Sequence, residues 1–379
     1  MRITGETMPE TSIAELVSQC YQCGICSGVC PKARVKPGFL PRKMVFEMIS
    51  GFSSRAIDSG NGWACLTCGL CQLKCPMNVN FLDMIRETRY EMVGREVSCT
   101  IAHDGDFGSL YNIMKDEAIT PNRKEFLAED VKTDDKSEVL YFMGCLPYFD
   151  IIFRDDVGFE GIDIANNTIR LLNAVGIEPA LLDEEKCCGH DQLWRGQTDL
   201  FEALAEHNAK FLGKYDTIVT NCPECYRTLA IDYDEKMGMK LNVKHISALL
   251  SEKTGELSAN GNKKKVTFHD SCRLGRHMGV FDAPRELLNI MGYDINEMIK
   301  NREEALCCGV SAFVNCDDEN TSIRRQKMKQ ALDTGAEILV TPCPKCQIHL
   351  KCLQMAKSEP EYNIRIADLT TVLLENLKR

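Results

Sequence analysis

The chain has 379 residues, 44% of them apolar, and a formal charge of −10. This length and composition indicate two or three domains with ordinary packed cores and exclude disorder for most of the chain. The negative charge argues against a nucleic-acid partner, whose phosphates would be repelled. The first sixteen residues have no apolar segment typical of a signal peptide, and no run reaches the roughly 18 apolar residues of a membrane span. We expect a cytoplasmic protein that contacts a membrane only through a partner.

Cysteine is abundant, with 21 residues, and most of them stand at CxxC or CC spacings. A chain of this length does not need disulfides to fold, so metal ligation is the better interpretation.

A short capped helix is expected over 9–17, directly before the first cysteine cluster. Two clusters follow the pattern C-x2-C-x2-C-x3-C-P of bacterial ferredoxins, in which the fourth cysteine binds the other cluster. A pair of zinc sites is the alternative, which two complete eight-ligand runs disfavour. The exchange predicts one cubane [4Fe-4S] cluster on Cys20, Cys23, Cys26 and Cys75, and a second on Cys65, Cys68, Cys71 and Cys30.

The segment between the two runs has helical periodicity over Pro41–Ile49, which predicts a largely helical ferredoxin domain. A further helix is expected over Val79–Val93. Residues 95–137 are polar and aperiodic, so we expect a linker there. Five basic residues near the first run could dock an acidic partner or could form a solvated face: Lys32, Arg34, Lys36, Arg42 and Lys43.

The rest of the chain contains one cysteine pattern written twice. Thirty-three residues separate the CC pair from the CxxC in the first copy and thirty-four in the second, which indicates a duplicated unit. Five thiolates per copy exceed the four of a zinc site or a cubane cluster, so two unusual metal centres are expected. The copies are Cys145, Cys187, Cys188, Cys222 and Cys225, then Cys272, Cys307, Cys308, Cys343 and Cys346.

Each copy alternates apolar strand-like runs with helical segments, and the cysteines follow the strands, which predicts two small α/β units with parallel sheets. The expected strands are 139–143, 178–182, 217–220, 266–268 and 338–341, and the expected helices 164–175, 201–212 and 285–289.

Cys222 and Cys343 each precede a proline, which predicts a cysteine at a helix N-cap, where free N–H groups stabilise a thiolate. Gly189 and Gly309, after the CC pairs, are expected to let the backbone approach a cluster closely. The alternative for the CC pairs is that they are ordinary core cysteines. Three cysteines outside every pattern are interpreted as core or incidental thiols: Cys99, Cys316 and Cys352.

His190 and His269 are the histidines nearest the repeated cysteines, and each is a candidate proton donor or a structural hydrogen-bonding residue. The sequence contains no dinucleotide fingerprint, P-loop or GxSxG motif, so any chemistry must depend on iron and sulfur.

The fragments VTFHDSCRLGRHMG, LVTPCPKCQIHL and IVTNCPECYRTL resemble the cysteine-rich CCG-domain family. Behind a two-cluster ferredoxin domain, their order is similar to that of the D-type chain of heterodisulfide reductases. The resemblance implies an α+β multidomain chain with a ferredoxin-like domain over 1–95, a linker over 96–137 and CCG repeats over 138–255 and 256–379. It also implies a non-cubane [4Fe-4S] cluster on each five-cysteine set, with the disulfide of coenzymes M and B cleaved between the two.

Relatives of this kind also include electron-relay subunits of glycolate, lactate and glycerol-3-phosphate dehydrogenases, which have no disulfide substrate. A relay subunit is therefore the alternative function, and a zinc scaffold is a third. The resemblance implies an electron-donating partner, either a membrane cytochrome b or a soluble flavoprotein. The interval between the first cysteine and the CC pair is longer in the first repeat, 41 against 34 residues, and residues 149–163 are expected to reshape the substrate mouth.

Overall fold

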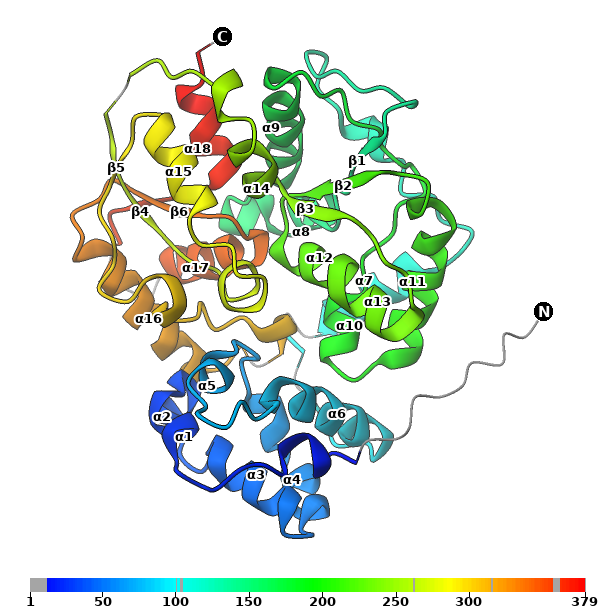
Figure 1. Cartoon of the computed structure of the whole chain (residues 1–379), viewed down its shortest axis with the longest axis vertical. Helices are drawn as coiled ribbons and strands as arrows, with labels where there is room; N and C mark the ends of the chain where they lie inside the picture. Colours follow the sequence, from blue (N-terminus) through cyan, green and yellow to red (C-terminus); the bar gives the residue numbers. More distant parts are fainter. Residues whose placement is uncertain are drawn as a thin grey trace.

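A computed structural model describes residues 12–99, 101–102, 105–261, 263–314, 316–356 and 362–378. Figure 1 shows a helical unit, drawn in blue, below two α/β lobes, one green and one yellow to red. The predicted α+β class is confirmed. Among the described residues, none of the helices is both long enough and apolar enough to cross a bilayer.

The helical unit contains both ferredoxin-type cysteine runs. The predicted helix over 41–49 is confirmed. The helix predicted over 79–93 spans Phe81–Gly94, and Asn80 before it accepts a hydrogen bond from the Asp83 amide. Among the described residues before Cys20, 12–19, the helical structure is a 3-10 turn, Glu15–Val17, and the start of the expected first helix lies outside them. The helices are α1 (Ile25–Val29), α2 (Pro31–Val35), α3 (Pro41–Ile49), α4 (Ser53–Asp58), α5 (Leu70–Leu73) and α6 (Phe81–Gly94).

The segment expected to be an aperiodic linker contains a helix, α7 (Asp106–Lys115), so the prediction was wrong there. Its apolar residues Phe107, Leu110, Tyr111 and Met114 stand at helical spacing. Phe107 and Tyr111 are buried, and the Phe107 ring stacks on Phe313 of the second lobe at a centroid distance of 4.0 Å. A short apolar stripe, packed mainly through its aromatic rings, therefore forms a helix within an otherwise polar segment.

The first lobe has a parallel sheet in the order β1-β2-β3. Its strands are β1 (Val139–Tyr141), β2 (Thr217–Thr220) and β3 (Val243–His245). Its helices are α8 (Leu146–Val157), α9 (Gly161–Ala174), α10 (His190–Trp194), α11 (Thr198–Leu212), α12 (Pro223–Arg227), α13 (Tyr233–Met237) and α14 (Ile246–Ser251).

The second lobe repeats this plan with a four-stranded parallel sheet in the order β5-β4-β6-β7. Its strands are β4 (Lys265–Phe268), β5 (Asp294–Ile295), β6 (Ile338–Thr341) and β7 (Arg365–Asp368). Its helices are α15 (Ala283–Ile290), α16 (Asp318–Leu332), α17 (Pro344–Met355) and α18 (Leu369–Asn376).

The expected strand over 178–182 is reduced to one parallel bridge between Ala180 and Leu140. Pro179 has no N–H group to donate, so the ladder does not extend past it. Ala180 lies beside β1 in the first sheet, and the short strand β5 lies beside β4 in the second. These positions correspond, so the two sheets have the same strand order.

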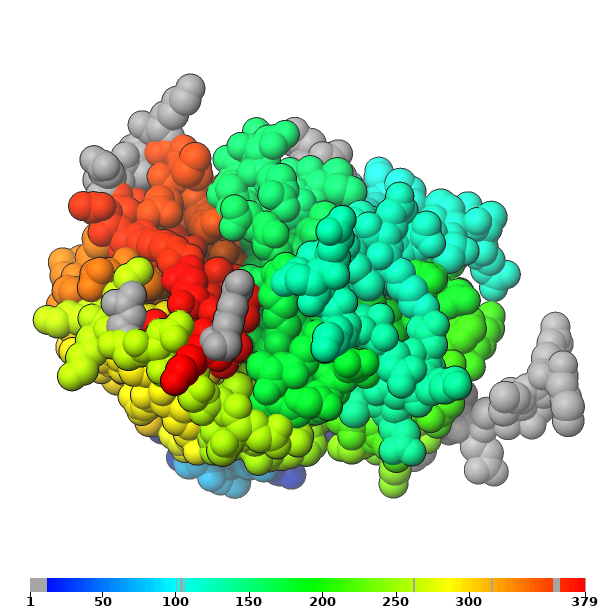
Figure 2. Space-filling view, turned by 90° about the horizontal axis from the view of Figure 1, so that it is seen from above, coloured from blue at the N-terminus to red at the C-terminus, as the bar shows by residue number. Residues whose placement is uncertain are grey.

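The two lobes pack directly against each other, and Figure 2 shows them side by side from above. Helices α9 and α18 meet at this seam, where Asn167 donates a hydrogen bond to Thr371 at 3.2 Å.

Part of the predicted basic surface is internal. Lys32 is fully buried, and its ammonium lies 3.0 Å from the Asp317 carboxylate and 2.6 Å from the Asn320 side-chain oxygen at the start of α16. Lys36 pairs with Glu319 at 3.5 Å. Both lysines therefore attach the helical unit to the second lobe, and for them the expectation of a docking patch or solvated face was wrong.

We predict that Lys32→Met lowers the free energy of unfolding by about 1.5–3 kcal/mol, because charge-assisted hydrogen bonds are lost without replacement by water. The matched control Lys36→Met removes a partly exposed pair and should cost less than about 1 kcal/mol. Urea unfolding of anaerobic protein, followed by circular dichroism, measures both variants. Equal losses would show that burial of Lys32 does not strengthen this contact.

Candidate metal centres

Four cysteine-lined cavities follow one another through the molecule. Two of them lie in the helical unit. The first is lined by Cys20, Cys23, Cys26 and Cys75, with Cys71 at its edge, and the second by Cys30, Cys65, Cys68 and Cys71. Cys75 thus shares a cavity with the first run and Cys30 with the second, in agreement with the predicted exchange. The ligand sets themselves stay predictions.

The loops in the helical unit aim backbone N–H groups at several sulfurs. The Gln22 amide lies 3.4 Å from the Cys20 sulfur and the Thr67 amide 3.3 Å from the Cys65 sulfur. Burial raises the pKa of Cys30 to about 12 and that of Cys65 to about 11. Thiols buried in this way ionise readily only when a cation takes the place of the proton, which is what an iron cluster offers.

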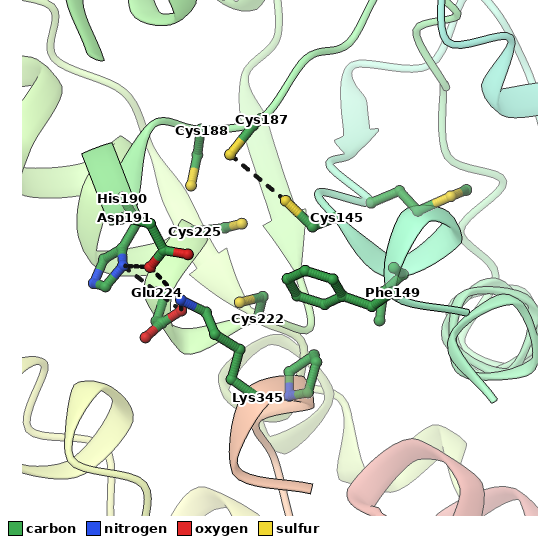
Figure 3. A pocket seen from close by; sticks show the side chains of 13 residues that line it. Cys145, Phe149, Cys187, Cys188, His190, Asp191, Cys222, Glu224, Cys225 and Lys345 are labelled. Atoms are coloured by element: carbon green, nitrogen blue, oxygen red, sulfur yellow. Dashed lines mark hydrogen bonds and ion pairs between the residues drawn. The ribbon is translucent and has the colours of Figure 1, made fainter. Parts of the chain in front are cut away.

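The third cavity gathers the five cysteines of the first repeat at the carboxyl ends of β1 and β2 (Figure 3). The Cys145 thiol donates to the Cys187 sulfur at 3.5 Å. Cys222 is the N-cap of α12 and Pro223 stands in the first turn, as predicted. Met143, Leu146 and Phe149 form an apolar wall on one side.

The fourth cavity gathers the five cysteines of the second repeat in the same way. The Cys346 thiol donates to the Cys308 sulfur at 3.2 Å, and Cys343 is the N-cap of α17. Leu66 and Thr67, from the ferredoxin-type run, also line this cavity, and Arg276 of the second repeat donates to the Cys68 carbonyl at 2.6 Å. The second repeat thus lies directly against the second ferredoxin-type cavity.

An ion pair that we did not predict separates the third and fourth cavities. Lys345, from the second CPxC motif, reaches the third cavity and pairs there with Glu224 of the first CPxC motif and with Asp191 (Figure 3). All three side chains are buried. Glu224 also lines the fourth cavity, so the two motifs face each other across this contact. The opposite charges of CPEC and CPKC were the only sign of it in the sequence.

Arg273, which follows Cys272 and lines the fourth cavity, contacts both the helical unit and a residue of the third cavity. Its guanidinium donates to the side chain of Thr67 at 2.8 Å and to Nε2 of His190 at 2.9 Å. It also lies over the ring of Trp194, 4.3 Å from the centroid. Arg273 begins a π-helical turn, Arg273–His277, of a kind that often occurs at functional sites and that residue patterns do not reveal.

The two candidate proton donors are both buried, and burial lowers the pKa of each. His190 lines the third cavity, and its Nδ1 lies 3.1 Å from the Asp191 carboxylate. Because Nε2 accepts from Arg273, the ring proton is on Nδ1. Neither ring nitrogen of His269 bonds to a described oxygen or nitrogen atom, and the ring lies with Cys308 and Cys346 in a group whose ligand atoms are within 4.8 Å of one another. A proton-donating role stays a prediction for both.

Three further cysteines line none of these four cavities: Cys99, Cys316 and Cys352. Cys99 and Cys352 are half-buried and Cys316 is exposed.

Gly189 and Gly309 both have left-handed backbones, with φ of +86° and +94°. Their surroundings differ. A Cβ at Gly189 would lie 2.6 Å from the Phe201 ring, whereas the nearest atom to one at Gly309 is 3.5 Å away. Both positions favour glycine because the backbone is left-handed, and at Gly189 a side chain would also collide with Phe201.

We therefore predict that Gly189→Ala reduces stability more than Gly309→Ala. Each carries a backbone penalty of about 1–2 kcal/mol, and Gly189→Ala adds about 1–3 kcal/mol for displacing Phe201. Thermal unfolding and iron content per chain of the two variants provide the comparison. Equal losses would contradict the steric explanation.

Comparison with known proteins agrees with this architecture. A 4Fe-4S dicluster domain matches residues 19–79, and a cysteine-rich domain called CCG matches residues 139–230 and 266–351. The D-type subunit of the dihydromethanophenazine:CoB--CoM heterodisulfide reductase of Methanosarcina barkeri is 30% identical over 87% of each chain.

EtfAB:quinone oxidoreductase of Syntrophomonas wolfei is 27% identical over 84% of this chain and 46% of its own length. A crystal structure of a hypothetical protein from Helicobacter pylori has a similar fold, with a TM-score of 0.52 and 10% identity over 90% of this chain and 69% of that one.

Proposed function

This chain belongs to the family of D-type heterodisulfide reductase subunits, and is thus an iron–sulfur subunit of this or a related oxidoreductase. From this premise, we propose that it reduces the disulfide of coenzymes M and B. The overall change is RSSR′ + 2e⁻ + 2H⁺ → RSH + R′SH. The observation that carries the proposal is that two complete five-cysteine cavities face each other across Glu224 and Lys345.

The donor sets fit the four clusters of the proposal, two cubane and two non-cubane. Each ferredoxin-type cavity offers four sulfurs from the predicted set, and each repeat offers five. Cys222 and Cys343 stand at helix N-caps, where the helix dipole stabilises a thiolate. When bound, the clusters supply one-electron carriers and, in the repeats, iron that can bind sulfur.

The order of the cavities supports a route for the electrons. Cys71 lines both cavities of the helical unit, and Leu66 lines both the second of these cavities and that of the second repeat. Glu224 lines the cavities of both repeats. Electrons from the partner would therefore pass through the first and second ferredoxin-type centres, then the second repeat, and reach the first repeat last.

The walls of the two repeat cavities suggest how a disulfide is held. Met143, Leu146 and Phe149 give the first repeat an apolar surface suited to an alkyl chain. Phe149 belongs to α8, the insertion that lengthens this repeat, which supports the expectation that residues 149–163 shape the substrate mouth. The opposite wall carries Lys345 and Glu224, which would orient polar groups beside the sulfurs.

Two protons must accompany the two electrons. His190 and His269 are the predicted donors because each lies beside one set of cysteines, His190 in the first repeat and His269 in the second. Neither side chain is exposed, so its proton would have to be replaced through the protein interior or through water that enters with the substrate.

The second candidate function is an electron relay with no substrate of its own. The relative named as an EtfAB:quinone oxidoreductase favours the relay, because its name indicates a quinone and not a disulfide as the electron acceptor. A membrane cytochrome b or a soluble flavoprotein would donate electrons under either proposal. Disulfide-dependent oxidation of reduced viologen by the purified chain supports the reductase, and its absence in cluster-replete protein supports the relay.

Metal analysis of the same preparation tests the cofactors. Four four-iron clusters correspond to about sixteen irons per chain. Zinc in place of iron would support a scaffold instead and contradict both redox functions.

We predict that Cys23→Ser blocks turnover driven by the physiological partner, because Cys23 lines the ferredoxin-type cavity at the start of the proposed route. Viologen, a small dye, should still drive part of the reaction by reaching later centres. Partner-driven and dye-driven rates are measured on the same preparation, with the lost cubane signal checked by EPR. Full partner-driven turnover without that signal would contradict the proposed route.

We also predict that Cys188→Ser and Cys308→Ser each abolish disulfide reduction while both cubane centres remain reducible. A two-electron cleavage between paired centres needs a sulfur acceptor on each side, so damage to one repeat should stop it. The viologen-coupled rate and low-temperature EPR are measured together. Substantial activity in either variant, with its non-cubane signal absent, would rule out cleavage between paired centres.

A further inference from the structure

The two repeats differ in charge at equivalent positions around their cysteines. The first cysteine of each repeat lies four residues after the end of a strand, β1 in the first repeat and β4 in the second. Residues of the two repeats can therefore be matched by their distance from these strands. The amides of Phe142 and His269 both donate to the neighbouring strand at 2.8 Å, which confirms that match. Equivalent positions are therefore defined by the backbone and not only by residue counts.

Residues next to the first cysteine show the difference most clearly. Cys145 is followed by Leu146 and, three residues later, Phe149, whereas Cys272 is followed by Arg273 and, three residues later, Arg276. Both guanidiniums hydrogen-bond to neutral groups, and no carboxylate of the described residues pairs with either. Arg273 contacts Thr67, His190 and His277, and Arg276 contacts the carbonyls of Cys68, Glu303 and Ala305. Their positive charge is thus available to the cysteine sulfurs.

The long helix that follows each CC pair, α11 or α16, has buried cationic side chains in the second repeat only, and Lys327 is one of them. Buried positions on α11 and α16 have the same spacing, with Phe201 and Asn320 seven residues before Asn208 and Lys327. Asn208 is satisfied by the backbone of Lys186 and Cys187. The Lys327 ammonium is fully buried and has no hydrogen-bond partner in the part of the chain that the structure describes.

Lys327 lies on α16, which packs against α17, the helix that carries Cys346. Burial lowers the pKa of Lys327 to about 8, while Asp270, Cys346 and Cys308 favour its charged form. His269, in place of Phe142, adds a polar ring beside the same two sulfurs. The nearby acid Asp270 is already paired with Arg285 at 2.8 Å. In the first repeat, by contrast, Asp191 and Glu224 share the cation Lys345.

A reduced cluster carries one more negative charge than an oxidised one, so buried cations and hydrogen-bond donors favour reduction. We propose that the second five-cysteine centre has the higher reduction potential of the two and holds the first electron that leaves the ferredoxin-type centres, with Lys327 as a principal cause. This inference rests on the proposed function in that both repeats hold clusters. The two repeats then have different roles. The second centre stores an electron, and the first, beside the apolar wall, is reduced last.

The test is a dye-mediated redox titration of anaerobic, cluster-replete protein without any disulfide, followed by low-temperature EPR. We expect two non-cubane transitions. Lys327→Met should lower only the higher one, by at least a tenfold change in the equilibrium constant, which is about 59 mV for one electron. Lys329→Met, an exposed lysine on the same helix, is the matched control and should move neither transition.

Lys327→Arg keeps the charge and should keep the higher transition near its wild-type position, which separates charge from packing. Lys327→Gln serves as a second neutral variant if the methionine variant does not assemble. Coincident transitions in the wild type, or a shift of the lower transition in a neutral variant, would overturn the inference. Because no disulfide is present, these results are independent of the viologen assay that tests the proposed function.

Discussion

The arrangement of the two repeats depends on the buried ammonium of Lys345. Its partners Asp191 and Glu224 come from the first repeat, whereas Lys345 lies between two cysteines of the second. Removal of one partner from a buried ion pair is expensive, about 3–5 kcal/mol, because the remaining charge is left without compensation. This contact therefore fixes the two CPxC motifs face to face, and with them the cavities between which the proposed reaction occurs.

Duplication followed by local change explains how one unit can serve two purposes. The backbone plan, the five cysteines and the N-caps before proline are kept in both repeats. Residues next to them differ in character: Leu146 corresponds to Arg273, and Phe142 to His269. Under the proposed function, the apolar side chains of the first cavity would hold the substrate. In the second repeat, Arg273 contacts Thr67 of the helical unit.

Most of the fold and the cysteine groupings could be predicted from the sequence, since strands such as 217–220 and the Cys-Pro helix starts depend on local pattern. The failures have physical causes. Helix α7 was missed because its apolar stripe has only four residues within a polar segment, and its Phe107 ring packs on Phe313, a residue far along the chain. The sequence predicted Lys32 at the surface because its partners Asp317 and Asn320 lie 285 and 288 residues away along the chain. Contacts between distant polar residues, including the Lys345 cluster, leave no periodic pattern.

The central claim is that one disulfide is bound between two iron centres of the repeats. Iron anomalous diffraction from anaerobic crystals soaked with the disulfide tests it most directly. We expect iron in all four cysteine-lined cavities and substrate density that extends from Phe149 toward Glu224 and Lys345. Iron confined to the two cavities of the helical unit, or substrate bound away from the repeats, would contradict the claim.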